Sequence, residues 1–200
     1  MCDLREYLWD AEYIEENDEE VKVIVPAGKE VDVTDPCYDR DTWCRTTVPL
    51  PPDAYTAFVT YSDQGEWGER VAASGICKDL MLRHASCAYF KPAGKVGVDA
   101  GLMGFFVDKP DYSDDEWSRM IDEMRAYADA HGGKWPNVWT KDGGFMTSSG
   151  FGDGEYPVFL ITDASGNAVG VMVVYIDCYT DVDDEDEVSL WDTGEEEQEE

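Results

Sequence analysis

EYPVFLIT at residues 155–162 and AVGVMVVYI at residues 168–176 are the two stretches that decide the fold. Both are rich in β-branched and aromatic residues, which favour extended strands. The five residues between them, DASGN at 163–167, supply the Asp, Gly and Asn that tight turns use. The sequence therefore predicts an antiparallel hairpin near the C-terminal end of the chain.

Further strands are predicted upstream of this hairpin, at residues 21–25, 31–34, 54–61, 70–76, 96–101 and 103–108. One helix is predicted at 113–130, where Ser113 and Glu116 have the spacing of a capping box and Gly132-Gly133 ends the apolar periodicity. Strands and helices do not alternate along the chain. We therefore expect an α+β fold, with a mostly antiparallel sheet, sandwich-like or half-barrel, and the helix packed on one face.

The formal net charge of −30 is concentrated at the two ends of the chain. Residues 1–20 carry nine acidic residues and one arginine, whereas residues 181–200 carry twelve acidic residues and no basic one. We therefore divide the chain into an acidic N-terminal segment at 1–20, a single β-rich domain at 21–180 and an acidic tail at 181–200. Leu4 and Leu8 lie at helical spacing, which predicts a short helix in the N-terminal segment.

This composition excludes several classes of protein. A strongly acidic chain repels nucleic acids and anionic membranes, and it attracts basic protein surfaces. The sequence contains no apolar run of roughly 18 residues, which a membrane-spanning helix needs, and its first residues do not form a secretory signal. The six cysteines include no CxxC pair, so we expect reduced thiols in a cytoplasmic protein.

The sequence offers little for catalysis. His84 and His131 are the two histidines, and histidine is the side chain that ordinarily titrates near neutral pH. His84 lies near Cys77 and Cys87, and such a pair could form a Cys–His nucleophile. Because no recognised motif surrounds either cysteine, we assign no catalytic residue.

Three aspartates could form a divalent metal site. Asp35, Asp99 and Asp153 each lie beside a Gly, Pro or Ala-Gly turn at the end of a predicted strand. Three carboxylates on separate loops could converge on a cation that prefers oxygen ligands. The alternative is that each carboxylate caps its own turn by hydrogen bonds to the local backbone. Apart from this metal, the sequence indicates no cofactor.

The acidic tail is a second candidate site. It combines carboxylates with one apolar pair, and such segments dock on grooves that are basic and partly apolar. The residues concerned are Asp181, Asp183, Asp184, Glu185, Asp186, Glu187, Leu190 and Trp191. The alternative is that Leu190 and Trp191 hold the tail against its own domain.

Four segments resemble the uncharacterised bacterial domain-of-unknown-function 4241 family. Asp35-Pro36 resembles its early DP element, and residues 48–55 (VPLPPDAY) are similar to its proline-rich start of a strand. Residues 97–101 (GVDAG) resemble its VDxG element, and residues 149–156 (SGFGDGEY) its C-terminal GxGDGxY hairpin. The resemblance covers roughly residues 30–177 and implies a common β-rich fold. It implies no biochemical activity.

The charge and the lack of catalytic motifs predict a non-enzymatic, acidic protein-binding module. Its partner would be a basic protein, and specifically a nucleic-acid-binding enzyme. In the extreme form the chain would mimic nucleic acid, as phage-encoded inhibitors of restriction or CRISPR effectors do. Two alternatives stay open: a metal-dependent hydrolase that uses Asp35, Asp99 and Asp153, and an immunity-type or structural protein with solvating tails.

Overall fold

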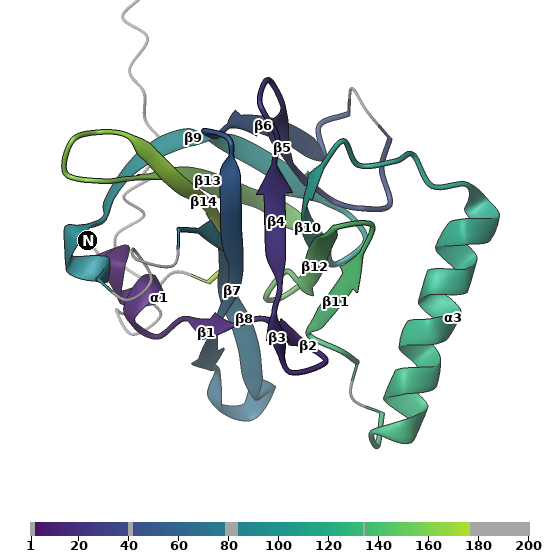
Figure 1. Cartoon of the computed structure of the whole chain (residues 1–200). Coiled ribbons are helices and arrows are strands. Elements are labelled where there is room, and N and C mark those ends of the chain that lie inside the picture. Colours follow the sequence, from purple (N-terminus) through teal and green to yellow (C-terminus); the bar gives the residue numbers. More distant parts are fainter. Residues whose placement is uncertain (1–2, 40–41, 79–83, 134, 177–200) are drawn as a thin grey trace, which may run out of the picture.

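Two antiparallel β-sheets and one long helix make up the fold (Figure 1). The computed structural model describes residues 3–39, 42–78, 84–133 and 135–176. The antiparallel sheets and the single main helix confirm the predicted α+β class. No helix in these four ranges is long and apolar enough to cross a membrane.

The larger sheet has seven strands in the order β1-β7-β8-β14-β13-β9, and β4 also pairs with β7. Its strands are β1 (Glu12–Tyr13), β4 (Lys22–Val25), β7 (Asp53–Asp63), β8 (Glu69–Cys77), β9 (Tyr89–Val98), β13 (Gly154–Thr162) and β14 (Ala168–Val174). The predicted C-terminal hairpin is confirmed as β13–β14, in which Val158 lies opposite Val173. Its turn is closed by Asp163, whose carboxylate accepts from the backbone N–H groups of Ser165 and Asn167, both at 2.9 Å.

The smaller sheet has five strands in the order β11-β12-β10-β5-β6. They are β5 (Glu30–Thr34), β6 (Arg45–Pro49), β10 (Leu102–Val107), β11 (Val138–Lys141) and β12 (Gly144–Ser148). The chain passes from the larger sheet to the smaller between β9 and β10, through Gly101 at φ 68°. A separate hairpin is formed by β2 (Glu15–Glu16) and β3 (Glu19–Glu20).

The larger hydrophobic cluster contains buried residues from both sheets. Phe105 and Phe145 of the smaller sheet stack with ring centroids 5.2 Å apart, and they belong to the same buried cluster as Val171 of the larger sheet. The hydroxyl of Thr147 in β12 donates to the hydroxyl of Ser74 in β8 over 3.1 Å, which links the sheets inside the core. Burial of this apolar surface is the main source of stability for the fold.

The long helix, α3 (Asp114–Ala130), forms as predicted. Ser113 and Glu116 make the expected reciprocal capping box, which satisfies two backbone N–H groups at its start. Met120 and Met124 pack against Phe106 of the smaller sheet. The other helical elements are α1 (Arg5–Trp9), which is the short N-terminal helix expected from Leu4 and Leu8, and the 3₁₀ turns η1 (Gly65–Trp67) and η2 (Ala85–Cys87).

Six strands were not predicted: β1, β2, β3, β6, β11 and β12. Each has five residues or fewer, too short to show a clear alternation of apolar and polar residues. The first half of β9 was also missed, because Pro92 and Gly94 interrupt it.

Candidate functional site

Asp35 and Asp99, two of the three predicted metal ligands, lie side by side, but the carboxylate of Asp35 is already hydrogen-bonded to backbone N–H groups. Asp35 is buried, and its carboxylate accepts from the backbone N–H groups of Cys37 at 2.9 Å, Asp99 at 2.8 Å and Ala100 at 2.7 Å. The Asp99 carboxylate instead accepts the hydroxyl of Tyr38. Burial raises the pKa of Asp35, although these N–H groups act in the opposite direction. Asp35 therefore links its own loop, which contains Cys37, to the loop that contains Asp99 and Ala100.

Asp153 does not complete a metal site. It precedes Gly154, which pairs with Val98, so its backbone lies across from Asp99, but its side chain is exposed. The described part of the chain holds no group of three or more His, Cys, Asp or Glu side chains that could bind a metal. The arrangement matches the turn-capping alternative for Asp35, and the metal hypothesis gains no support from it.

The tail proposed as a partner-binding site, from Asp181 to Trp191, lies outside the described residues. The remaining acidic end is described from Asp3 onward. It packs on the domain, because Tyr7, Leu8 and Ile14 are buried in the main core.

An acidic hairpin, residues 15–20 (EENDEE), projects from this N-terminal segment. Asn17 and Asp18 form its two-residue turn with φ values of 54° and 65°, and Asn and Asp tolerate this left-handed conformation better than other side chains. Glu15 lies opposite Glu20, and Glu16 lies opposite Glu19. Like charges in directly opposed pairs destabilise a hairpin. The local sequence therefore works against the structure it adopts.

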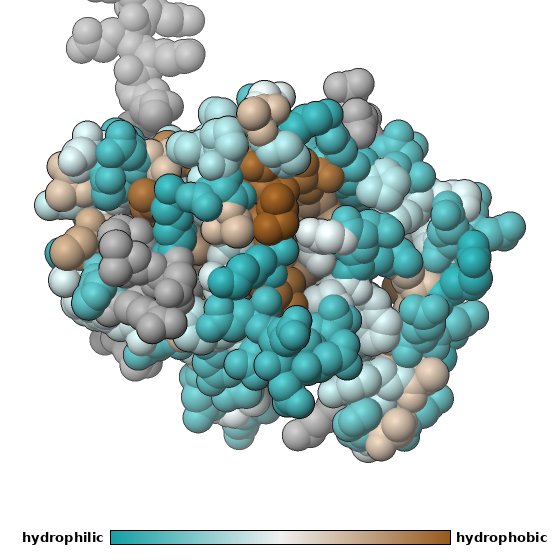
Figure 2. Space-filling view, viewed as in Figure 1, coloured by the Kyte–Doolittle hydropathy of each residue, from teal (hydrophilic) through white to brown (hydrophobic). Residues whose placement is uncertain are grey.

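The base of the hairpin is fixed to the larger sheet. The backbone N–H of Val21 donates to the carbonyl of Ile14 over 2.7 Å, and Ala57 of β7 bonds to both residues at 2.9–3.1 Å. The side chain of Ile14 is buried in the core. These anchors hold four glutamates at a defined place on the surface. Figure 2 shows hydrophilic residues gathered over this hairpin, below an apolar area over β4.

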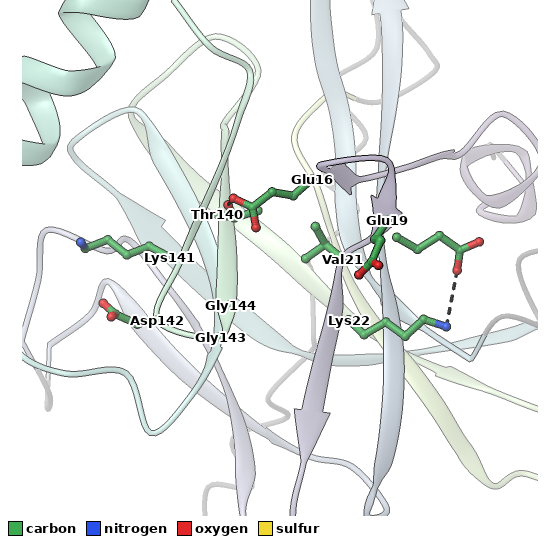
Figure 3. Close-up of a pocket in the computed structure, with 10 residues that line it drawn as sticks. Glu16, Glu19, Val21, Lys22, Thr140, Lys141, Asp142, Gly143 and Gly144 are labelled. Carbon is green, nitrogen blue, oxygen red and sulfur yellow. Dashed lines mark hydrogen bonds and ion pairs between the residues drawn. The ribbon is translucent and has the colours of Figure 1, made fainter.

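A groove separates the hairpin from strand β11, and we call it the edge groove. One hollow of about 390 Å³ lies between Glu16, Glu19 and Glu20 on the hairpin and residues 140–144. A second, of about 370 Å³, shares Glu16 with the first and extends to Glu123 of α3. Figure 3 shows Glu16 reaching toward Thr140, whose hydroxyl donates to its carboxylate over 2.5 Å.

The charge of the edge groove is strongly negative. Its two hollows are lined by six carboxylates, against the ammonium groups of Lys22 and Lys141. Lys22 lies 3.4 Å from Glu20, the contact drawn in Figure 3. Lys141 points away from the hairpin and lies 5.9 Å from the ring centre of Tyr112. Among the described residues, Glu20 is therefore the glutamate of this groove that forms an ion pair, and Glu15, Glu16, Glu19 and Glu123 form none.

An aromatic hollow continues the groove at the start of β11. It measures about 560 Å³ and is lined by Tyr61, Tyr127, His131, Trp135 and Trp139, among others. Trp135 is 52% exposed, and Tyr127 is 40% exposed and stacks on His131 with ring centroids 3.9 Å apart. Exposed aromatic faces beside carboxylates favour cationic and aromatic side chains of a partner.

The four cysteines in the described ranges give no sign of an activated nucleophile. Cys37, Cys44, Cys77 and Cys87 are free thiols. Burial raises the pKa of Cys77 to about 12 and that of Cys44 to about 11. A raised pKa keeps the thiol protonated and unreactive, so the suggested pairing of Cys77 with His84 gains no support.

Sequence reasoning did not find the edge groove. Glutamate is uncommon in strands, so EENDEE predicts no strand and indicates only an acidic segment. The signal it contains is the Asn17-Asp18 dipeptide, which is typical of two-residue hairpin turns.

No protein-family model matches this chain, and no curated protein or solved structure matches it either.

Proposed function

We propose that this protein is a non-enzymatic binding module whose edge groove engages a basic protein. The observation that carries the proposal is that the β2–β3 hairpin places glutamate opposite glutamate in two cross-strand pairs. Each like-charge pair costs roughly 0.2–1 kcal/mol. A basic partner would turn this repulsion into attraction, so the hairpin would be more stable in the complex than alone.

The partner class that fits best is a nucleic-acid-binding enzyme. Such enzymes present long basic surfaces to phosphates, and a fixed row of carboxylates can occupy the same surfaces. The chain would then act as a nucleic-acid mimic and inhibitor, of the phage anti-restriction or anti-CRISPR type. The acidic tail, including Leu190 and Trp191, would add to this surface. We place this activity in the cytoplasm.

Binding to purified restriction enzymes and CRISPR effectors tests this proposal, by calorimetry and by competition with a labelled DNA duplex. Glu16→Gln with Glu19→Gln should weaken binding. A matched control, Glu66→Gln with Glu69→Gln, changes the total charge equally at exposed positions in and beside η1 and should leave binding unchanged. Equal effects of the two variants, or binding that ignores salt between about 50 and 500 mM, would contradict the proposal.

Two earlier hypotheses remain proposals without a specific observation in their favour. A metal-dependent hydrolase would need Asp35 and Asp99 to release their present hydrogen bonds and converge with Asp153. Membership of the domain-of-unknown-function 4241 family rests on the four sequence segments alone. We further propose a sandwich-like arrangement of the two sheets, which is supported by their common core.

A further inference from the structure

Strand β11 has one free edge. It is the last strand of the smaller sheet, and of the described strands only β12 pairs with it. The N–H of Ser148 donates to the carbonyl of Asn137 over 3.0 Å, and hydrogen-bonded pairs alternate in an antiparallel ladder. Trp139 and Lys141 therefore bond to β12, while Val138 and Thr140 direct their N–H and C=O groups away from it.

These outward N–H and C=O groups have no backbone partner among the residues that the structure describes. Within the described ranges, no backbone hydrogen bond outside the β12 ladder involves Val138 or Thr140. A row of unpaired N–H and C=O groups is a template for another strand. All four residues of β11 are partly exposed and line the second hollow of the edge groove.

Other elements pack on both faces of the smaller sheet beside the free edge of β11. On one face, Trp139 packs with the cluster beneath α3. On the other face, Val138 packs against the main core, and Thr140 bonds to Glu16 of the hairpin. The second hollow of the edge groove runs between these flanks, with Glu15 and Glu16 on one side and Glu123 on the other. A strand laid along β11 would thus have carboxylates on both of its faces.

The negative charge beside β11 determines which kind of strand can pair with its free edge. An added strand has side chains alternating between its two faces, and here both faces meet glutamates. The acidic tail of this chain would be repelled, and so would a second copy, which brings the same acidic hairpin. A basic segment would be attracted on both faces, and the aromatic hollow around Trp135 would accept a cationic or aromatic side chain at one end.

We infer that the basic partner adds an extended segment to β11 as a further strand of the smaller sheet. This inference rests on the proposed function and specifies how the partner is held. Charge supplies the attraction, and backbone hydrogen bonds to Val138 and Thr140 supply the alignment.

A synthetic peptide that repeats Arg-Arg-Val-Val, and so carries arginines on both faces of an extended strand, tests the inference with the full chain. Thr140→Pro removes one outward N–H without breaking the β12 ladder, since proline is tolerated on the open side of an edge strand. Thr140→Val is the matched control, because it loses the hydroxyl and keeps the N–H. We expect Thr140→Pro to weaken peptide binding about tenfold more than Thr140→Val does, the effect of losing one or two hydrogen bonds. Both variants lose the hydroxyl contact to Glu16, so the comparison isolates the backbone N–H.

A second measurement does not depend on how Thr140→Pro folds. The same peptide is methylated on the backbone nitrogens of alternate residues, in either of the two possible registers. Methylation should abolish binding in one register and spare it in the other, because only alternate N–H groups of an added strand face β11.

The outcomes separate the inference from the proposed function. Peptide binding that ignores both methylation and Thr140→Pro would overturn strand addition and leave a charge-driven module intact. Failure of the unmodified peptide to bind at low salt would overturn both. A wild-type dimer that Thr140→Pro converts to a monomer would assign the edge to a second copy and overturn the inference.

Discussion

Replacing Asp35 by alanine tests whether this carboxylate is structural. The side chain is fully buried and accepts three backbone N–H groups at 2.7–2.9 Å. Asp35→Ala leaves three donors without a partner, and an orphaned buried donor costs about 1–3 kcal/mol. Water entering the vacated space will satisfy some donors, and the variant no longer buries a carboxylate. We therefore expect a loss of about 2–4 kcal/mol in the free energy of unfolding.

Urea denaturation, followed by tryptophan fluorescence, measures this loss. Asp153→Ala is the matched control, because Asp153 was the third predicted metal ligand and its side chain is exposed. We expect Asp153→Ala to change the free energy of unfolding by less than about 0.5 kcal/mol. The metal hypothesis expects a different result, in which both substitutions abolish metal binding. A loss below about 1 kcal/mol for Asp35→Ala would refute the structural role assigned here.

Three further predictions concern the same part of the fold. Asp32 accepts from Arg45 over 2.5 Å in a nearly buried ion pair, so Asp32→Ala should cost about 3–5 kcal/mol in urea denaturation and Asp32→Leu with Arg45→Leu clearly less. A Cβ at Gly97 would overlap the Trp43 ring, so Gly97→Ala should displace that indole and shift its fluorescence. Burial raises the pKa of Asp35 above its ordinary 3.8, so the added stability that comes from protonating this carboxyl is complete below that pH and is lost as the pH rises through the folded-state pKa. Stability relative to Asp35→Asn, measured from about pH 3 to 7, should therefore fall with rising pH.

The elements predicted from the sequence are those with strong local signals. The β13–β14 hairpin has two long apolar strands and a turn closed by Asp163, and α3 has a capping box together with helical periodicity. In both, short-range hydrogen bonds and the apolar pattern favour the same structure. The sequence of residues 138–148 carries no such pattern, because β11 and β12 become strands only by pairing with β10 and each other.

The candidate site could not be predicted for a related reason. The edge groove joins the hairpin at residues 15–20, Glu123 of α3 and strand β11, which are distant in sequence. Their proximity depends on the anchoring of Ile14 and Val21 to β7 and on the packing of α3 against the smaller sheet. The sequence shows the total negative charge. It does not show that part of this charge lies beside the backbone N–H and C=O groups at the edge of β11.

The acidic flanks of β11 could serve a different purpose, which is to prevent the free edge from pairing with other copies. Charge of either sign would give this protection, and a hairpin with opposite charges in its cross-strand pairs would also be more stable. Glu19→Lys creates such a pair with Glu16. It should stabilise the chain by up to about 1 kcal/mol and weaken the binding of the arginine–valine peptide. Unchanged peptide binding by this variant would show that the glutamates only protect the edge.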